Sequence, residues 1–148
     1  MDILKPAWLE RTALRGHYMQ LCLTEAEVLA CAKALKVEVD DKAFPCHKHG
    51  FHVTLENKSV RSCVSMIYVN IEWCLDQADA EMVLVHEAIH ARQALFKTMG
   101  VRVIDDEIEA YTTECLYSTL RNELHRRVDF TTPKPSLKRK VKKIKEQK

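Results

Sequence analysis

Apolar and polar residues fall into a helical pattern in the first third of the chain. Thr24 is followed by Glu27 at the spacing of a capping box, and the apolar positions after them recur at helical intervals (Val28, Leu29, Cys31, Ala32 and Leu35). We therefore expect a helix of about three turns over this segment. A shorter helix is expected before it, over residues 7–20.

The middle of the chain is rich in residues that favour strands. Two such runs cover residues 51–55 and 60–71, and the polar stretch ENKS separates them. Two runs of β-branched and aromatic residues joined by a polar turn predict an antiparallel hairpin or meander.

Two longer helical patterns follow the strands. The first, EMVLVHEAIHARQALFKTMG at residues 81–100, is apolar on most sides, so we expect it to be buried. Asp76 or Asp79 is expected to cap its start, and Gly100 to end it. The second pattern spans residues 105–127, with acidic residues in its first turn and basic residues in its last, as the helix dipole favours.

Together these elements predict an α+β fold. A small antiparallel sheet is expected to pack against the helix over residues 81–100, while the helix over 105–127 crosses behind and N-terminal helices cover the rest. At 148 residues, with 47% hydrophobic and 30% charged residues, the chain has the size and composition of one globular domain. We expect this domain to span residues 1–130.

Several features of the sequence bear on where in the cell the protein is expected to act. The longest apolar runs are far shorter than the roughly 20 residues of a membrane span, and the first twenty residues lack the apolar centre of a secretory signal. The six cysteines contain no C-x-x-C pair, so we expect most of them to be buried free thiols. These features predict a cytoplasmic protein with no membrane span.

Positive charge is concentrated at the end of the chain. The net charge is only +2, yet eight of the 23 basic residues lie in the last fifteen positions. We expect residues 131–148 to form a basic, disordered tail that makes weak contact with nucleic acid or another anionic surface. No aromatic residue interleaves with these lysines, which counts against a dedicated single-strand binder.

The buried helical pattern contains the motif H-E-x-x-H at His86, Glu87 and His90. Residues four apart on a helix share one face, so both imidazoles can bind one metal ion. Glu87 lies one step round the helix, where it can reach a water on that ion and act as general base. The strand residues 65–71 lie just upstream, where an edge strand could bind an extended peptide.

A third metal ligand is expected from the acidic start of the following helix, because no third histidine follows at metzincin spacing. Glu107 and Glu109 are the candidates, and they point roughly 200° apart on a helix, so only one can face the ion. We favour Glu107, which shares its face with the small residue Ala110 and with Tyr111.

Other polar residues near these positions have more than one interpretation. Tyr111 can donate its hydroxyl to a developing oxyanion or simply pack between helices. Asp105 or Asp106 can accept the second N–H of a ligand histidine or cap the helix. The cluster CHKHGFH places four further candidate ligands close together (Cys46, His47, His49 and His52), for a second zinc or for contact with substrate. A polar loop that enters a strand explains this cluster better.

The segment HEAIHA followed by EIEA resembles the gluzincins, zincin-like peptidases whose third ligand lies in an E-x-x-A helix. The resemblance covers about residues 65–118. It is nearest to the small mitochondrial inner-membrane processing-protease family, whose pattern is H-E-x-I-H and then E-I-R-A. The segment also resembles the short ImmA/IrrE-type peptidases. It implies one Zn²⁺ ion held by His86, His90 and Glu107, with Glu87 as base. Glu109 stands where the processing family has arginine, so the substrate is not carried over.

The sequence therefore predicts a zinc metallopeptidase that acts on a protein or peptide. Two alternatives stay open. One is a catalytically idle zincin-like domain that uses the fold to bind a partner or holds zinc for stability. The other is a nucleic-acid-associated protein that binds through its basic tail.

Overall fold

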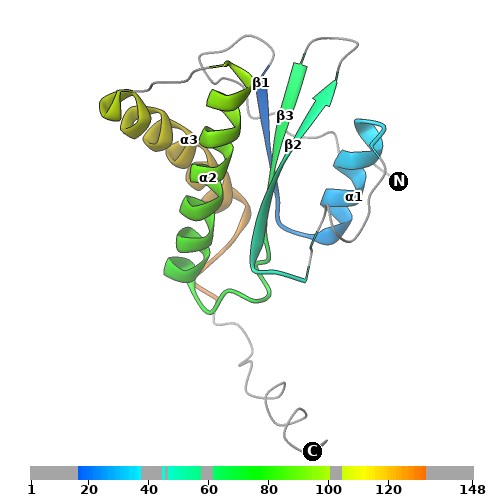
Figure 1. The fold of residues 1–148 in the computed structure, drawn as a ribbon. Helices are drawn as coiled ribbons and strands as arrows, with labels where there is room; N and C mark the ends of the chain where they lie inside the picture. The colour runs from blue at the N-terminus through cyan, green and yellow to red at the C-terminus, as the bar shows by residue number, and fades with distance from the viewer. Residues whose placement is uncertain (1–16, 38–44, 46, 58–61, 101–104, 133–148) are drawn as a thin grey trace, which may run out of the picture.

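The computed structural model describes residues 17–37, 45, 47–57, 62–100 and 105–132. Within these ranges it has an α+β fold, which confirms the predicted fold class (Figure 1). The elements in chain order are β1 (His17–Cys22), α1 (Glu25–Ala34), β2 (Gly50–Asn57), β3 (Ser62–Val69), α2 (Gln77–Thr98) and α3 (Asp106–Arg127). The sheet lies between α1 on one side and α2 and α3 on the other (Figure 1).

The three strands form a mixed sheet in the order β1-β3-β2. β2 and β3 pair antiparallel, with Phe51 opposite Tyr68, so the predicted hairpin is confirmed. β1 pairs parallel to β3, with His17 opposite Cys63, so the prediction of a purely antiparallel sheet is wrong. The connection from β1 to β3 runs through α1 and β2, which supplies the length that a parallel pairing needs.

The helix predicted over residues 7–20 is also wrong where the structure describes it, because residues from His17 onward form strand β1. Residues 7–16 lie outside the described ranges. Pairing with β3 explains the difference: Met19 and Leu21 are buried beneath the helices, and this tertiary contact outweighs local preference.

The helix starts follow the predicted capping pattern. Thr24 Oγ1 accepts the Glu27 N–H at 3.3 Å, and Asp76 Oδ1 accepts the Asp79 N–H at 2.9 Å. Asp105 Oδ1 accepts the Glu107 N–H at 2.9 Å, so Asp105 caps α3. Each such cap is worth about 1 kcal/mol, which helps to fix where each helix begins.

Apolar side chains fill both faces of the sheet. The face toward α2 and α3 has the larger core (Met19, Leu21, Leu23, Ile67, Val69, Cys74, Ala80, Leu84, Ala88, Ala91, Leu116, Leu120 and Leu124). The face toward α1 has a smaller one (Cys22, Val28, Cys31, Ala32, Phe51, Met66 and Tyr68). Burial of each large side chain contributes about 1.5–3 kcal/mol, so α2 is held firmly on the sheet. Of the helices that the structure describes, none combines enough length and apolar character to cross a membrane.

A polar cluster joins α2 to α3. Glu81 accepts hydrogen bonds from Tyr117 at 3.2 Å and from His125 at 2.6 Å, and it forms an ion pair with Arg121 at 3.2 Å. Partial burial alone raises the pKa of Glu81, but the hydrogen bonds from Gln77, Arg121, His125 and Tyr117 outweigh it and lower the pKa to about 2. The charged carboxylate therefore fixes the register of the two helices.

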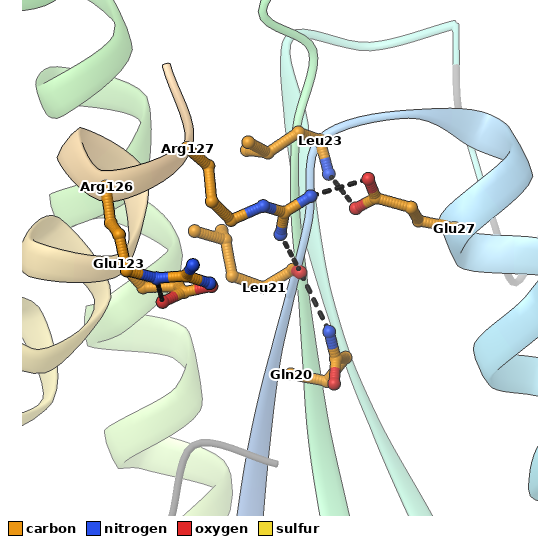
Figure 2. Close-up of polar contacts among 7 residues, drawn as sticks. All are labelled: Gln20, Leu21, Leu23, Glu27, Glu123, Arg126 and Arg127. Atoms are coloured by element: carbon orange, nitrogen blue, oxygen red, sulfur yellow. Dashed lines mark hydrogen bonds and ion pairs between the residues drawn. The ribbon is translucent and has the colours of Figure 1, made fainter. Parts of the chain in front are cut away.

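Arg127, the last residue of α3, ties that helix to β1 and α1 (Figure 2). Its guanidinium donates to the carbonyl of Leu21 at 3.0 Å and to Glu27 Oε1 at 2.5 Å. The other oxygen of Glu27 accepts the Leu23 N–H at 2.9 Å. One arginine thus connects the end of α3 to two elements that lie at least 100 positions earlier in the sequence.

Candidate metal centre

His86 and His90 lie side by side in the middle of α2. Their Nε2 atoms are 3.1 Å apart, and the two rings are nearly perpendicular, at 84°. Two nitrogens bound to one tetrahedral zinc ion at 2.0–2.1 Å are separated by about 3.3–3.4 Å. Both side chains are exposed, so an ion and a substrate can approach them. The pair fits two of the ligand positions of a zinc site.

The second ring nitrogen of His90 has a partner on the same helix. His90 Nδ1 lies 3.3 Å from Gln93 Oε1. In the tautomer that donates from Nδ1, Nε2 keeps its lone pair free, as metal ligation requires. The sequence left Asp105 and Asp106 either this role or a capping role, and Asp105 caps α3. Gln93 stands three residues after His90, so helical spacing was the signal that could have identified it.

Glu87 is buried against the sheet, with only 6% of its surface exposed. Burial raises the pKa of Glu87, and the positive charges of His86, His90 and Lys48 oppose that rise. A carboxyl group whose pKa lies above its usual range suits a group that must take up a proton and later release it.

Gly50 brings strand β2 unusually close to α2 at this point. A Cβ on Gly50 would lie 2.5 Å from Val83 Cγ1 and 2.9 Å from the carbonyl oxygen of Tyr68. It would also lie 3.3 Å from the Cγ of Glu87. Only glycine fits there without a shift, so the start of β2 lies directly beside the candidate base.

An open hollow of about 630 Å³ adjoins Glu87 and His86. It is lined by residues from the loop before β2, from the turn after β3 and from the first half of α2, among them His47, Lys48, Trp73 and Met82. The volume lies in the range of about 300–1,000 Å³ that is usual for ligand pockets.

The histidines of the CHKHGFH cluster are spread over different positions, and Cys46 lies outside the described ranges. His47 and His49 line the hollow, where the His49 ring stands edge-on to Trp73 at 5.4 Å. His52 lies on β2, with Nε2 3.3 Å from Thr54 Oγ1. The structure therefore does not gather these residues into a second zinc site in the part of the chain that it describes.

Two histidines on the sheet were not recognised as a pair from the sequence. Burial, together with the nearby charges of His90 and His17, lowers the pKa of His52 to about 4. His17 is buried as well, and its Nε2 lies 3.0 Å from Ser65 Oγ. Burial therefore favours the neutral form of both imidazoles, and His52 is close enough to His90 to be influenced by its charge.

The acidic candidates lie at the start of α3. Glu109 forms an ion pair with Arg92 at 3.1 Å, while Glu107 is exposed. Among the described residues, no group of three histidine, cysteine, aspartate or glutamate side chains is arranged to hold a metal ion. The structure thus brings His86, Glu87 and His90 together, but none of the residues that it describes joins them as a third ligand. Tyr111 is 66% exposed on α3, and its catalytic role stays a prediction.

The edge strand beside α2 is β2, and not the strand over residues 65–71 that the sequence suggested. Residues 65–71 begin within β3, which is the central strand, with hydrogen-bonded neighbours on both sides. β3 therefore cannot accept a further strand. β2 is the edge strand that packs on α2, and its start lies next to Glu87.

Comparison with known proteins gives no relative: no family model, curated protein or solved structure matches this chain significantly. The resemblance to gluzincins therefore depends on the motif residues themselves.

Proposed function

We propose that this protein is a zinc-dependent metallopeptidase. One observation carries the proposal: the Nε2 atoms of His86 and His90 converge to 3.1 Å beside the buried carboxyl group of Glu87. Two imidazoles four residues apart and an adjacent carboxylate are the groups that zinc-dependent hydrolysis of a peptide bond needs.

Glu87 acts as the general base. When bound, zinc lowers the pKa of its water to about 7 and polarises the substrate carbonyl. Glu87 takes the proton from the attacking water and passes it to the leaving amine. Its buried position beside Gly50 limits competing hydrogen bonds with solvent, and Gln93 holds the His90 ring in place.

Glu107 is the third ligand that we propose. The carboxylate of Glu109 is engaged with Arg92, at 3.1 Å, whereas no ion pair engages that of Glu107 among the described residues. Loading of the site then requires the first turn of α3 to bring Glu107 to the histidine pair. Residues 101–104, which precede that turn, lie outside the described ranges.

The substrate that we propose is an extended stretch of protein or peptide bound along the outer edge of β2. No described strand pairs with that edge. A peptide added there forms main-chain hydrogen bonds with β2 and is led past Glu87 at Gly50.

We further propose that the protein acts in the cytoplasm, where thiols stay reduced. Four of the cysteines whose side chains the structure describes are free, namely Cys22, Cys31, Cys74 and Cys115. Residues 131–148 are proposed to make weak, salt-dependent contact with nucleic acid or another anionic surface.

A catalytically idle zincin-like domain is the second candidate. The observation that favours it is the lack of a third ligand beside the histidine pair within the described residues. Such a domain binds metal or a protein partner but does not cleave peptides.

Removal and return of the metal tests the proposed activity. We expect a pool of unstructured peptides to be cleaved by the zinc-loaded protein, cleavage to stop after chelation, and one equivalent of zinc to restore it. Mass spectrometry of the pool gives the rate of each cleavage. Lys33→Ala, at an exposed position on α1 on the other side of the sheet, is the control and should behave as wild type. Cleavage that persists without metal contradicts the proposal, and zinc-loaded protein that cleaves nothing favours the idle domain.

A further inference from the structure

The hollow beside Glu87 has bulky apolar side chains that the fold leaves partly exposed. Trp73, in the turn after β3, is 41% exposed, and Met82, on α2, is 65% exposed. Both line the hollow together with Val83. Large apolar side chains gathered at one concave surface mark a place where a ligand binds.

These side chains are close to the reacting groups. Met82 precedes His86 by four residues, so the two share one face of α2. His86 and Glu87 line the same hollow as Trp73 and Met82. Whatever fills this space therefore lies next to the bond that Glu87 would help to cleave.

The part of the apolar wall that Trp73 and Val83 form is held in position. The ring of His49 stands edge-on to Trp73, with centroids 5.4 Å apart and an angle of 82°. The close packing of Gly50 on Val83 holds the loop before β2 against the helix. A wall that is already ordered loses little conformational entropy when a ligand binds.

Charged side chains line the hollow as well, among them Asp79 and Lys48. Asp79 accepts the Leu75 N–H at 2.9 Å as part of the start of α2, so its carboxylate is already engaged. Lys48 is exposed and forms no ion pair with another described residue. An acidic ligand group is therefore the alternative that a test must separate from an apolar one.

We propose that this hollow is a substrate subsite for a bulky apolar side chain, which packs between Trp73 and Met82. The protein then selects peptides with an aromatic or long aliphatic residue beside the bond to be cleaved. This inference deepens the proposed peptidase function and rests on it, because the bound peptide is a substrate only if the protein cleaves it. The binding preference itself can be measured without turnover.

The experiment uses zinc-loaded protein that carries Glu87→Gln, so that peptides bind without being cleaved. The probes are fluorescently labelled pentapeptides, Ala-Ala-X-Ala-Ala with blocked ends, in which X is Phe, Leu, Ala or Glu. Fluorescence anisotropy gives each Kd. Because burial of a large apolar side chain changes an equilibrium about tenfold to a hundredfold, we expect Phe and Leu to bind at least tenfold more tightly than Ala.

Further variants test whether Trp73 and Met82 cause the preference for apolar peptides. We expect Trp73→Ala and Met82→Ser, each added to Glu87→Gln, to bring the Phe and Leu peptides to within about threefold of the Ala peptide. Leu75→Ala is the matched control, since Leu75 is 73% exposed and does not line the hollow. It should keep the full preference.

Three results overturn the subsite: equal binding of all four peptides, tightest binding of the Glu peptide, or a preference that survives both Trp73→Ala and Met82→Ser. If the wild-type protein cleaves peptides without an apolar preference, the peptidase proposal stands and the subsite proposal is wrong. If the protein prefers apolar peptides but cleaves none, it has an apolar binding site and the peptidase proposal is wrong.

Discussion

Replacement of Glu87 by Gln is expected to lower kcat for peptide hydrolysis by about 10²–10⁴-fold while zinc stays bound. The amide has nearly the shape of the carboxylate but cannot accept the proton of the attacking water. Since Glu87 is buried and burial disfavours its charge, the neutral amide should not destabilise the fold. The rate and the zinc content are measured on the same preparation.

Glu114→Gln serves as the control, because Glu114 is exposed on α3. It should retain the wild-type kcat and the same zinc content. Undiminished hydrolysis in zinc-loaded Glu87→Gln protein contradicts the role of Glu87 as general base. Loss of zinc from that variant indicates instead that Glu87 helps to hold the metal.

Replacement of Arg127 by Ala is expected to lower the free energy of unfolding by about 2–3 kcal/mol. The change leaves Glu27 without its cation and the Leu21 carbonyl without this donor. Both charged side chains are 21% exposed, so the loss should be below the 3–5 kcal/mol that is typical of fully buried pairs. Urea denaturation followed by circular dichroism measures it.

Lys97→Ala is the control for a removed surface cation, since Lys97 is exposed in the last turn of α2. It should change stability by less than about 0.5 kcal/mol. Arg127→Lys keeps the positive charge but cannot reach both acceptors with one rigid group, so its loss should lie in between. An Arg127→Ala protein as stable as wild type would show that α3 is anchored by its apolar face alone.

The parts of the fold that depend on local sequence could be predicted. Thr24 with Glu27 gave the start of α1, and the polar turn between two β-rich runs gave the hairpin. Strand β1 could not be predicted in the same way, because it exists through parallel pairing with β3, whose residues lie more than forty positions away. Local propensity carries no information about such a partner.

The same division applies to the candidate site. His86, Glu87 and His90 lie within one helix, so their spacing alone placed the imidazoles together. The hollow could not be predicted, since it joins Lys48, Trp73 and Met82 from three separate segments. Glu27 shows a further limit: its capping-box role was evident from Thr24, but its contact with Arg127, 100 positions away, was not.

The zinc content of the purified protein tests the central claim most directly. Elemental analysis after equilibration with zinc and removal of the excess should find one ion per chain in wild-type protein. His86→Ala should hold less than about a tenth of that amount, because loss of a direct ligand weakens zinc binding more than the 10–100-fold caused by loss of a supporting residue. Wild-type protein without zinc, or His86→Ala protein that keeps a full equivalent, would contradict the account.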